Sequence, residues 1–346
     1  MAISCVDLFC GAGGLTHGFV KEGLPVSAGI DLDAACRFPY EENNNSQFIE
    51  KDVSSMKTNE LNHLFGGADI RILAGCAPCQ PFSTYAQRYD IKRNERWSLL
   101  DEFARLAKGS RPEIITMENV PTVQRHEIFH EFVKKLEKFG YHVWYQIVDS
   151  THYGVPQTRK RMVLLASLLG PIKIIKKTHV KAKTLKQVIG RLKPLGAGEC
   201  CTRDRLHVSA SLSDINLKRI RVSKPGGSWR DWPKNLVAEC HKESSGSTYP
   251  SVYGRMEWEK PAPTMTTQCY GYGNGRFGHP EQDRAISLRE AAIIQGFPRN
   301  YKFLEKGQKP EFRTLGRMIG NAVPVGLGQA IAKSIKAHLD DLGLLN

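Results

Sequence analysis

The sequence predicts an α/β protein with a doubly wound, mostly parallel sheet and a second, smaller domain that is rich in loops. Short apolar runs alternate with amphipathic helical patterns over about the first 180 residues, which is typical of parallel sheets covered by helices. Past residue 180 the alternation fades, and glycine, serine, lysine and arginine dominate. We expect three segments: a first domain at 1–180, the smaller domain at 181–288, and a return at 289–346 that completes the first domain.

Each element is predicted from its own pattern. Strands are expected where short apolar runs stand between turn residues, at 3–9, 26–30, 47–49, 70–74, 113–117, 141–148 and 162–166. Amphipathic helices are expected from the first glycine turn through Val20, and at 99–108 and 127–139. Later in the chain we expect a basic helix at 181–192, a short helix at 288–295, and an apolar helix at 325–338 that docks on the sheet.

The composition is typical of a soluble globular protein. Of the 346 residues 41% are hydrophobic, and no apolar run approaches the ~18 residues of a membrane span. The first residues lead directly into a strand-like run and lack a signal-peptide pattern, so we expect a cytoplasmic protein. The nine cysteines are then expected to be free thiols.

Positive charge is concentrated in one quarter of the chain. Residues 171–260 hold 19 Lys and Arg against 8 Asp and Glu, whereas the remaining residues hold 30 against 27. The whole chain carries a net charge of +14. A basic block beside a nearly neutral remainder favours a dedicated segment for binding a polyanion, with nucleic acid as the first candidate.

A glycine-rich turn at 11–14 connects the first strand to the first helix. It can bring a ligand to a helix N-terminus, or it can serve chain geometry alone. It is not the dinucleotide fingerprint, because Thr16 stands where the third glycine is required. Asp31 and Asp52, at the ends of the next two strands, are either solvated turn residues or part of a pocket for an adenosine-bearing cofactor. S-adenosylmethionine fits such a pocket, with Leu32 packed on the adenine.

A thiol stands where the fourth strand ends. The stretch 75–83, GCAPCQPFS, follows the apolar run at 70–74, and open α/β sheets bind ligands at such strand ends. Cys79 is a candidate nucleophile there. The pair Cys76 and Cys79 could instead be a redox pair or half of a zinc site, and a single buried cysteine is often inert. No second Cys-x-x-Cys and no histidine pair at zinc spacing follows, so no metal is expected.

Charged residues at two later strands complete the candidate site. Glu118 ends the strand at 113–117, where burial suits a carboxyl group to general acid chemistry. Arg159 and Arg161 stand two residues apart, just before or within a strand. We therefore expect both guanidiniums on one face.

Basic and glycine-rich loops are candidates for contact with nucleic acid. The basic segment 84–97 is interpreted as a mobile lid, with an ordinary surface loop as the alternative. The segment 270–278 interleaves glycine with aromatic residues and an arginine, and it either presents side chains to base edges or is a flexible linker. Arg255 and Arg276 are candidates for contact with bases or phosphates, although each could instead be a solvated surface charge.

Taken together, these motifs resemble the prokaryotic cytosine-C5 DNA methyltransferases of restriction–modification type, from about residue 3 to residue 338. Five stretches match the family's motifs in the family's order, at 7–14, 78–80, 118–120, 157–161 and 320–323. A basic variable segment separates the fourth match from the fifth. The resemblance implies a sheet of the S-adenosylmethionine-dependent methyltransferase type and a small domain that recognises DNA.

The resemblance also implies roles at the matching positions. Cys79 would attack C6 of a flipped-out cytosine, and Glu118 would hold N3 and N4 of that base. Arg161 would bind the base O2, and Arg159 would support the site. The residues expected to hold S-adenosylmethionine are Phe9, Ala12, Gly13, Asp31, Leu32, Asp52, Val53, Pro78 and Asn321. The residues expected at DNA, besides Arg255 and Arg276, are Gln80, Ser83 and Thr264, the last at the target phosphate. Cys76 occupies a position where a common variant of the family has glycine.

The leading interpretation is a site-specific modification enzyme that acts on double-stranded DNA as a monomer. It would share its recognition site with a restriction endonuclease without forming a stable complex. A second enzyme interpretation is cytosine methylation of transfer RNA on the same fold. A catalytically dead DNA-binding protein is disfavoured, because Cys79, Glu118 and both arginines are present. A nicotinamide oxidoreductase is disfavoured by the glycine pattern.

Overall fold

The computed structural model describes residues 1–78, 94–243 and 246–345. The chain forms two compact units, which are treated separately below. Unit 1 comprises residues 1–153, 160–178 and 323–346, and unit 2 comprises residues 154–159 and 179–322.

Unit 1 is built on a seven-stranded sheet in the order β3-β2-β1-β4-β5-β7-β6. Its strands are β1 (Ile3–Leu8), β2 (Val26–Asp31), β3 (Gln47–Glu50), β4 (Ile70–Gly75), β5 (Ile114–Asn119), β6 (His142–Asp149) and β7 (Lys160–Ser167). The pairs among β1 to β5 are parallel, and β7 runs antiparallel to both β5 and β6. The predicted doubly wound, mostly parallel sheet is therefore confirmed, and the strand bounds differ from the predicted ones by one or two residues.

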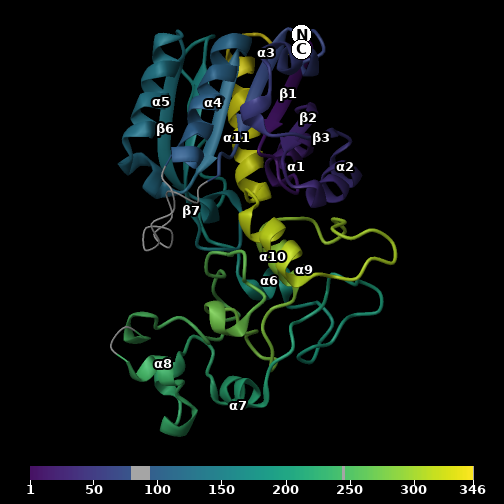
Figure 1. Ribbon diagram of the computed structural model, residues 1–346, viewed down its shortest axis with the longest axis vertical. Coiled ribbons are helices and arrows are strands. Elements are labelled where there is room, and N and C mark those ends of the chain that lie inside the picture. Colours follow the sequence, from purple (N-terminus) through teal and green to yellow (C-terminus); the bar gives the residue numbers. More distant parts are fainter. Residues whose placement is uncertain (79–93, 244–245, 346) are drawn as a thin grey trace. The chain divides into compact units, whose positions relative to one another are not determined.

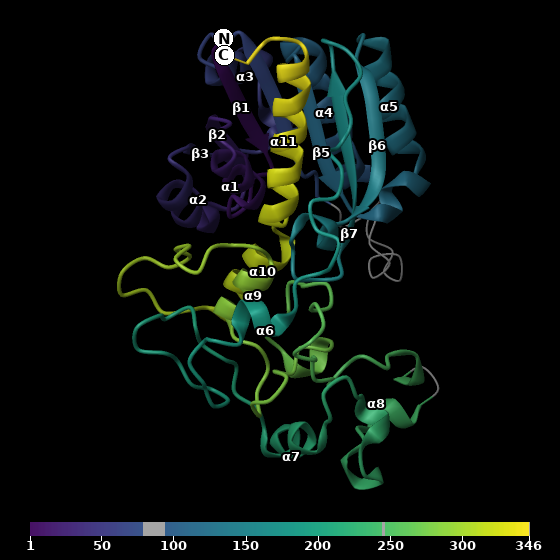
Figure 2. The same cartoon turned by 180° about the vertical axis from the view of Figure 1, so that it is seen from behind.

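Helices cover both faces of this sheet (Figures 1 and 2). The helices of unit 1 are α1 (Gly14–Lys21), α2 (Arg37–Asn44), α3 (Thr58–Leu64), α4 (Asn94–Ser110), α5 (Glu127–Lys138) and α11 (Val325–Asp341). Side chains of α3, α4 and α5 form one apolar core with the sheet, and those of α1 and α11 form another. The C-terminal helix thus docks on this unit, as its apolar pattern predicts. Of the helices that the structure describes, none is long and apolar enough to cross a membrane.

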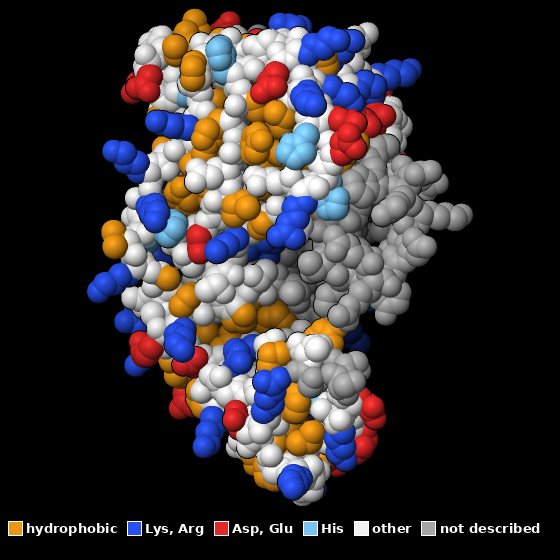
Figure 3. All heavy atoms as spheres, turned by 90° about the vertical axis from the view of Figure 1, so that its left-hand side faces the viewer, with side chains coloured by type: hydrophobic (Ala, Val, Ile, Leu, Met, Phe, Trp, Pro, Cys, Tyr) orange, Lys and Arg blue, Asp and Glu red, His pale blue; other side chains and the backbone are white. Residues whose placement is uncertain are grey.

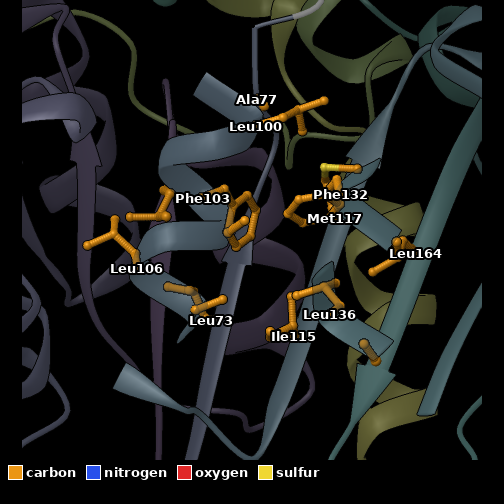
Figure 4. Packing of buried hydrophobic residues seen from close by; sticks show 14 of the residues in the cluster. Leu73, Ala77, Leu100, Phe103, Leu106, Ile115, Met117, Phe132, Leu136 and Leu164 are labelled. Carbon is orange, nitrogen blue, oxygen red and sulfur yellow. The ribbon is translucent and has the colours of Figure 1, made fainter. Parts of the chain in front are cut away.

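The core under α4 and α5 also fixes the start of the loop after β4. Phe103 of α4 lies among Leu73, Ile115 and Met117 of β4 and β5 (Figure 4). Ala77, just beyond β4, belongs to the same cluster and is only 2% exposed. Apolar burial of this kind stabilises a fold by about 25 cal/mol per Å². The loop that leads to Cys79 therefore starts from an anchored residue.

Glycine allows α11 to approach α1 closely. A Cβ atom on Gly18 of α1 would lie 2.7 Å from the backbone of Gly328 in α11. No side chain tolerates such a contact with backbone atoms, so this crossing requires glycine. The close packing holds the C-terminal helix against the helix that follows the glycine turn.

The strand β6 forms one edge of the sheet. Its Tyr145 and Ile147 are 38% and 41% exposed, although they lie on the edge of an otherwise buried layer. The side of the molecule that carries α5 and β6 shows hydrophobic side chains between basic and histidine side chains (Figure 3).

Unit 2 is dominated by loops, as the loss of periodicity predicts. Its helices are α6 (Leu185–Ile189), α7 (Asp214–Val222), α8 (Glu239–Lys242), α9 (Leu288–Ile294) and α10 (Phe312–Asn321). The helix expected at 181–192 is thus limited to α6, which Thr184 caps at its start and which ends at Gly190. An apolar cluster holds α7 to the surrounding loops and consists of Ile220, Trp229, Trp232, Leu236, Tyr272 and Ala285.

A buried ion pair holds α9 to the preceding loop of unit 2. Arg284 and Glu290 are 0% and 1% exposed, and the two Nη atoms lie 2.7 and 2.8 Å from the carboxylate oxygens. Glu290 also accepts a hydrogen bond from the N–H of Ser287, which caps α9. These contacts keep α9 in unit 2, and the return to unit 1 begins at Val323 rather than at the expected residue 289.

Candidate active site

The expected site residues of unit 1 gather at one edge of the sheet. Because β1 to β5 run parallel, their carboxyl ends share that edge. The strand order reverses between β1 and β4, and such switch points form the crevice in which open α/β sheets bind ligands. The glycine turn follows β1 there, and Cys76 follows β4.

The glycine turn has an unusual backbone. Phe9, Gly11 and Gly13 have positive φ angles of 59°, 51° and 84°. This region is unfavourable for phenylalanine, and residues held in it cluster at ligand sites. The N–H of Gly13 donates to the carbonyl of Cys10 at 3.0 Å, and α1 begins at Gly14. The turn therefore leads directly into a helix N-terminus, which favours polar or anionic ligand groups.

Asp31 connects this turn to the end of β2. Its Oδ2 accepts from the N–H of Gly11 at 2.8 Å, and its Oδ1 accepts from the N–H of Asp33 at 2.9 Å. Burial raises the pKa of Asp31, and the N–H donors counteract that effect. The neighbouring Leu32 is 70% exposed, which leaves an apolar surface beside a carboxylate. A ribose and an adenine ring require these two kinds of surface side by side.

Asp52 and Val53 follow β3 but differ in exposure. Asp52 is exposed and caps a short 3₁₀ helix (Val53–Ser55) by accepting from the N–H of Ser54 at 2.9 Å. Val53 is 2% exposed, and its side chain belongs to the core, so only its backbone can meet a ligand. Ala12 is likewise buried within the glycine turn.

A buried carboxyl group lies under the glycine turn. Asp7 of β1 is 1% exposed, and its Oδ2 accepts from Thr16 Oγ1 at 2.6 Å. Thr16 Oγ1 also lies 3.2 Å from the hydroxyl of Tyr40, which contacts Ser46 Oγ at 2.9 Å. The network joins β1, α1 and α2 behind the turn. Burial raises the pKa of Asp7 from 3.8 to about 7.

This shift makes stability depend on pH. The folded protein keeps a proton on Asp7 between about pH 4 and pH 7, where the unfolded chain has released it. The Asp7 contribution is therefore complete below pH 4 and is lost as pH rises through about 7. We expect Asp7→Asn to remove this pH-dependent part of the stability. The difference in unfolding free energy, wild type minus Asp7→Asn, should fall by on the order of 2–4 kcal/mol between pH 4 and pH 8.

Urea unfolding at several pH values, followed by circular dichroism, measures this difference. Groups common to both proteins contribute equally to the two pH profiles, so their effect cancels in the difference. One such group is His279, whose pKa is lowered by burial to about 4. Asp69→Asn is the matched control, because Asp69 is an exposed carboxylate of the same unit. A difference that stays constant with pH would contradict the assignment to Asp7.

Glu118 is buried near the end of β5 and has two polar neighbours. Its side chain is 3% exposed, and Oε1 lies 2.9 Å from Nε of Arg161. This contact is an ion pair without hydrogen-bond geometry. Its Oε2 accepts from Sγ of Cys76 at 3.0 Å. Because β5 lies between β4 and β7, the pairing of the sheet brings these three side chains together.

Asn119 fixes the loop that leaves β4. Its Nδ2 donates to the carbonyl of Ala77 at 3.1 Å, and its Oδ1 accepts from the N–H of Val120 at 2.8 Å. With the side chain of Ala77 buried in the core, this bond holds the residues around Cys76 against β5. Pro78, the next residue, is half-buried.

Three of the expected residues, Cys79, Gln80 and Ser83, lie outside the described residues. Most of the expected lid at 84–97 also lies outside them, and its last residues form the start of α4. The roles of these residues therefore stay predictions from the sequence.

Arg159 and Arg161 have separate partners. The Nη1 of Arg159 donates to the carbonyl of Met265 at 2.9 Å, and its Nη2 donates to that of Gly320 at 3.3 Å, all within unit 2. Since β7 begins at Lys160, strand alternation does not apply to Arg159. The expectation that both guanidiniums share one face therefore stays a prediction.

The expected DNA-contacting residues of unit 2 differ in how deeply their side chains are buried. Arg255 is 5% exposed, and its guanidinium donates to the carbonyls of Ile220, Ser223, His279 and Gln282 and pairs with Asp283. These contacts give Arg255 a structural role within unit 2, and it is not carried into the proposal below. The alternative of a solvated surface charge also does not describe it.

Arg276 and Thr264 are less buried than Arg255. Arg276 is half-buried, and its Nη1 donates to the carbonyl of Gly227. Thr264 is half-buried, and its hydroxyl donates to the carbonyl of Thr158 at 2.7 Å. Asn321, expected at the cofactor, is exposed at the end of α10 in unit 2, so its role stays a prediction.

The contacts of two residues, Cys76 in unit 1 and Gln157 in unit 2, are not predicted from the sequence. The thiol of Cys76 contacts Glu118, which the parallel strands expected at 70–74 and 113–117 could have indicated. Gln157 is fully buried and exchanges hydrogen bonds with Gln295 and Met265 across unit 2. No local pattern links such distant positions. Among the described residues, no group of three or more His, Cys, Asp or Glu side chains is arranged to hold a metal ion.

Comparisons with known proteins agree with this arrangement. The family model for C-5 cytosine-specific DNA methylases matches residues 3–337. The chain is 54% identical to the Type II methylase M.HgiDII of Herpetosiphon aurantiacus, over 99% of this chain and 97% of that protein. It is 29% identical to the Type II methyltransferase M1.HphI of Haemophilus parahaemolyticus, over 97% and 87%.

Solved structures share the fold. A prophage-encoded protein of E. coli, described as a DNA modification methyltransferase, aligns with a TM-score of 0.75 at 20% identity, over 98% of this chain and all of that one. The Dnmt2 methyltransferase of S. pombe aligns with a TM-score of 0.66 at 16% identity, over 98% and 99%. The chain belongs to the C-5 cytosine-specific DNA methylases, and its activity is methyl transfer to C5 of cytosine.

Proposed function

We propose that this protein transfers a methyl group from S-adenosylmethionine to C5 of a flipped-out cytosine in duplex DNA. It would be the modification enzyme of a restriction–modification system, as the Type II names of its relatives suggest. The observation that carries the proposal is the buried carboxylate of Glu118, held beside Arg161 and Cys76 near the end of β5. Cys79 follows Cys76 by three residues in the sequence.

The chemistry explains why a thiol and a carboxylate are needed together. C5 of cytosine is a weak nucleophile. Addition of the Cys79 thiolate to C6 forms an S–C bond and shifts the C5–C6 double-bond electrons, so that C5 can attack a methyl group. Glu118 would promote this addition by holding N3 and N4, and Arg161 would bind O2. Loss of the C5 proton to a proton acceptor then expels the thiolate and restores the C5–C6 double bond. The cytosine must leave the base stack for these contacts to form.

The edge of the sheet beyond β1 and β2 suits S-adenosylmethionine, which supplies an electrophilic methyl group. Asp31 would accept hydrogen bonds from the ribose, and the exposed Leu32 would pack on the adenine. Asp52 is exposed near the same edge, and the glycine turn offers backbone groups without a side chain in the way. The expected residues Phe9, Ala12, Gly13, Val53 and Pro78 of unit 1 would complete the pocket, Val53 through its backbone. The role of Asn321, which lies in unit 2, stays a prediction from the sequence.

We expect Asp31→Ala to weaken binding of S-adenosylmethionine by about 1.5–3 kcal/mol, the scale for losing hydrogen bonds to a charged group. Calorimetric titration of the cofactor measures this loss. Asp69→Ala is the control, because Asp69 precedes β4 and so stands at the opposite edge of the parallel strands. Wild-type affinity in Asp31→Ala would leave Asp31 only its role in tying the glycine turn to β2.

Unit 2 would recognise the DNA. The basic segment 171–260 falls mostly within it, and this charge suits a phosphate backbone. Arg276 stays a candidate for contact with a base or a nearby phosphate, and Thr264 for steadying the target phosphate. Gln80 and Ser83 would border the space that the flipped base vacates.

Bisulfite sequencing of plasmid DNA from cells that express the protein tests this function. Protected cytosines at one recurring motif, absent with Cys79→Ser, are the expected result. The transfer RNA alternative predicts unprotected plasmid and a methylated cytosine in transfer RNA from the same cells. That outcome would overturn the assignment of duplex DNA as substrate.

A further inference from the structure

The thiol of Cys76 has a partner that ordinary packing does not explain. Its Sγ lies 3.0 Å from Oε2 of Glu118, and the thiol donates to the carboxylate. The register that pairs Gly75 of β4 with Met117 of β5 places the next residues, Cys76 and Glu118, beside each other on the two neighbouring strands. The contact therefore follows from the sheet and does not depend on a flexible surface side chain.

The loop backbone keeps Cys76 in place. The N–H of Cys76 continues the pairing with β1 by donating to the carbonyl of Leu8 at 3.3 Å. On the other side, Ala77 is buried and its carbonyl accepts from Asn119. With a bond on one side and an anchored neighbour on the other, the thiol is held where it meets Glu118.

The two neighbours of Glu118 have different chemistry. Arg161 brings a positive charge to Oε1, whereas Cys76 brings a neutral donor to Oε2. A hydrogen bond to an ionised acceptor is stronger than one between neutral groups, and low solvent access strengthens it further. A neutral donor thus orients the carboxylate without adding a second positive charge beside it.

We infer that Cys76 is a positioning residue for methyl transfer, because its S–H fixes the carboxylate of Glu118 in the orientation that meets the target cytosine. This inference rests on the proposed role of Glu118. A glutamate has three rotatable side-chain bonds, so a donor that selects one orientation raises the fraction of productive geometry. Glycine at this position would leave Oε2 without that donor.

The test compares Cys76→Ala, which removes the donor, with Cys76→Ser, which replaces the thiol by a hydroxyl donor. Steady-state methylation of a duplex substrate gives kcat and KM, and thermal unfolding reports on the fold. We expect Cys76→Ala to lower kcat about ten-fold, the equivalent of ~1.4 kcal/mol, with KM for DNA and cofactor within about two-fold. Cys76→Ser should recover most of the lost kcat.

Two results would overturn the inference. One is a wild-type kcat in Cys76→Ala, which would leave the thiol without a role. The other is an equal loss of kcat in Cys76→Ala and Cys76→Ser, which would mean that volume, and not the donor, matters. Cys76→Gly, which also lacks the donor, replaces Cys76→Ala if the alanine variant does not fold.

A double-mutant cycle separates this inference from the proposed role of Glu118. In a Glu118→Ala background the change Cys76→Ala should have almost no further effect on kcat, because the acceptor is gone. If Glu118→Ala itself retains wild-type turnover, the proposed role of Glu118 fails. If Glu118→Ala loses turnover but the loss from Cys76→Ala persists in that background, only the role of Cys76 fails.

Discussion

Cys79→Ser is expected to abolish methyl transfer while leaving DNA binding almost unchanged. A serine hydroxyl is a far weaker nucleophile than a thiolate, so addition to C6 should nearly stop. We expect a loss of at least ~10³-fold in kcat, the scale seen when a covalent nucleophile is removed. Transfer of a tritiated methyl group to DNA measures turnover, and a gel shift measures binding.

A matched thiol controls for the loss of a cysteine. Cys240→Ser changes an exposed cysteine of unit 2 and should retain wild-type turnover. DNA that contains 5-fluorocytosine should trap a covalent adduct with wild type and with Cys240→Ser, but not with Cys79→Ser. Turnover near wild type in Cys79→Ser would remove Cys79 from the mechanism.

The sheet could be predicted because each strand has a local signal. The runs at 3–9, 70–74 and 113–117 are short, apolar and bounded by turn residues, and all three are strands within one or two residues. Helices with a weak apolar stripe escaped prediction, such as α2 (Arg37–Asn44) and α7 (Asp214–Val222). Their positions depend on tertiary packing, which local propensity does not encode.

The site was predicted where its residues follow strands directly. Asp31 and Glu118 both stand at strand ends, and the parallel sheet places those ends on one edge. The partners of the two arginines are not predictable from local patterns, because Arg159 meets the carbonyls of Met265 and Gly320 and Arg161 meets Glu118, all far away in the sequence. Arg255 differs from both sequence expectations, a DNA contact or a solvated charge, because a sequence does not reveal a buried guanidinium whose donors meet four distant carbonyls.

Glu118→Gln is expected to lower kcat by about 10²–10³-fold, within the range for removing general acid–base help. Glutamine keeps the size of the side chain and can still accept from Cys76, but it can neither carry the charge nor transfer a proton. It also leaves Arg161 without its ionic partner. Affinity for DNA should change little, because the loss concerns the reacting base.

The chain offers a control at the other end of the same strand. Glu113, just before β5, pairs with Arg71 at 2.8 Å, so Glu113→Gln breaks a similar ion pair at the edge away from the site. Single-turnover methylation of a duplex substrate should then be slow in Glu118→Gln and near wild type in Glu113→Gln. Equal rates in the two variants would show that breaking a Glu–Arg pair in this sheet, and not the chemistry of Glu118, governs the rate.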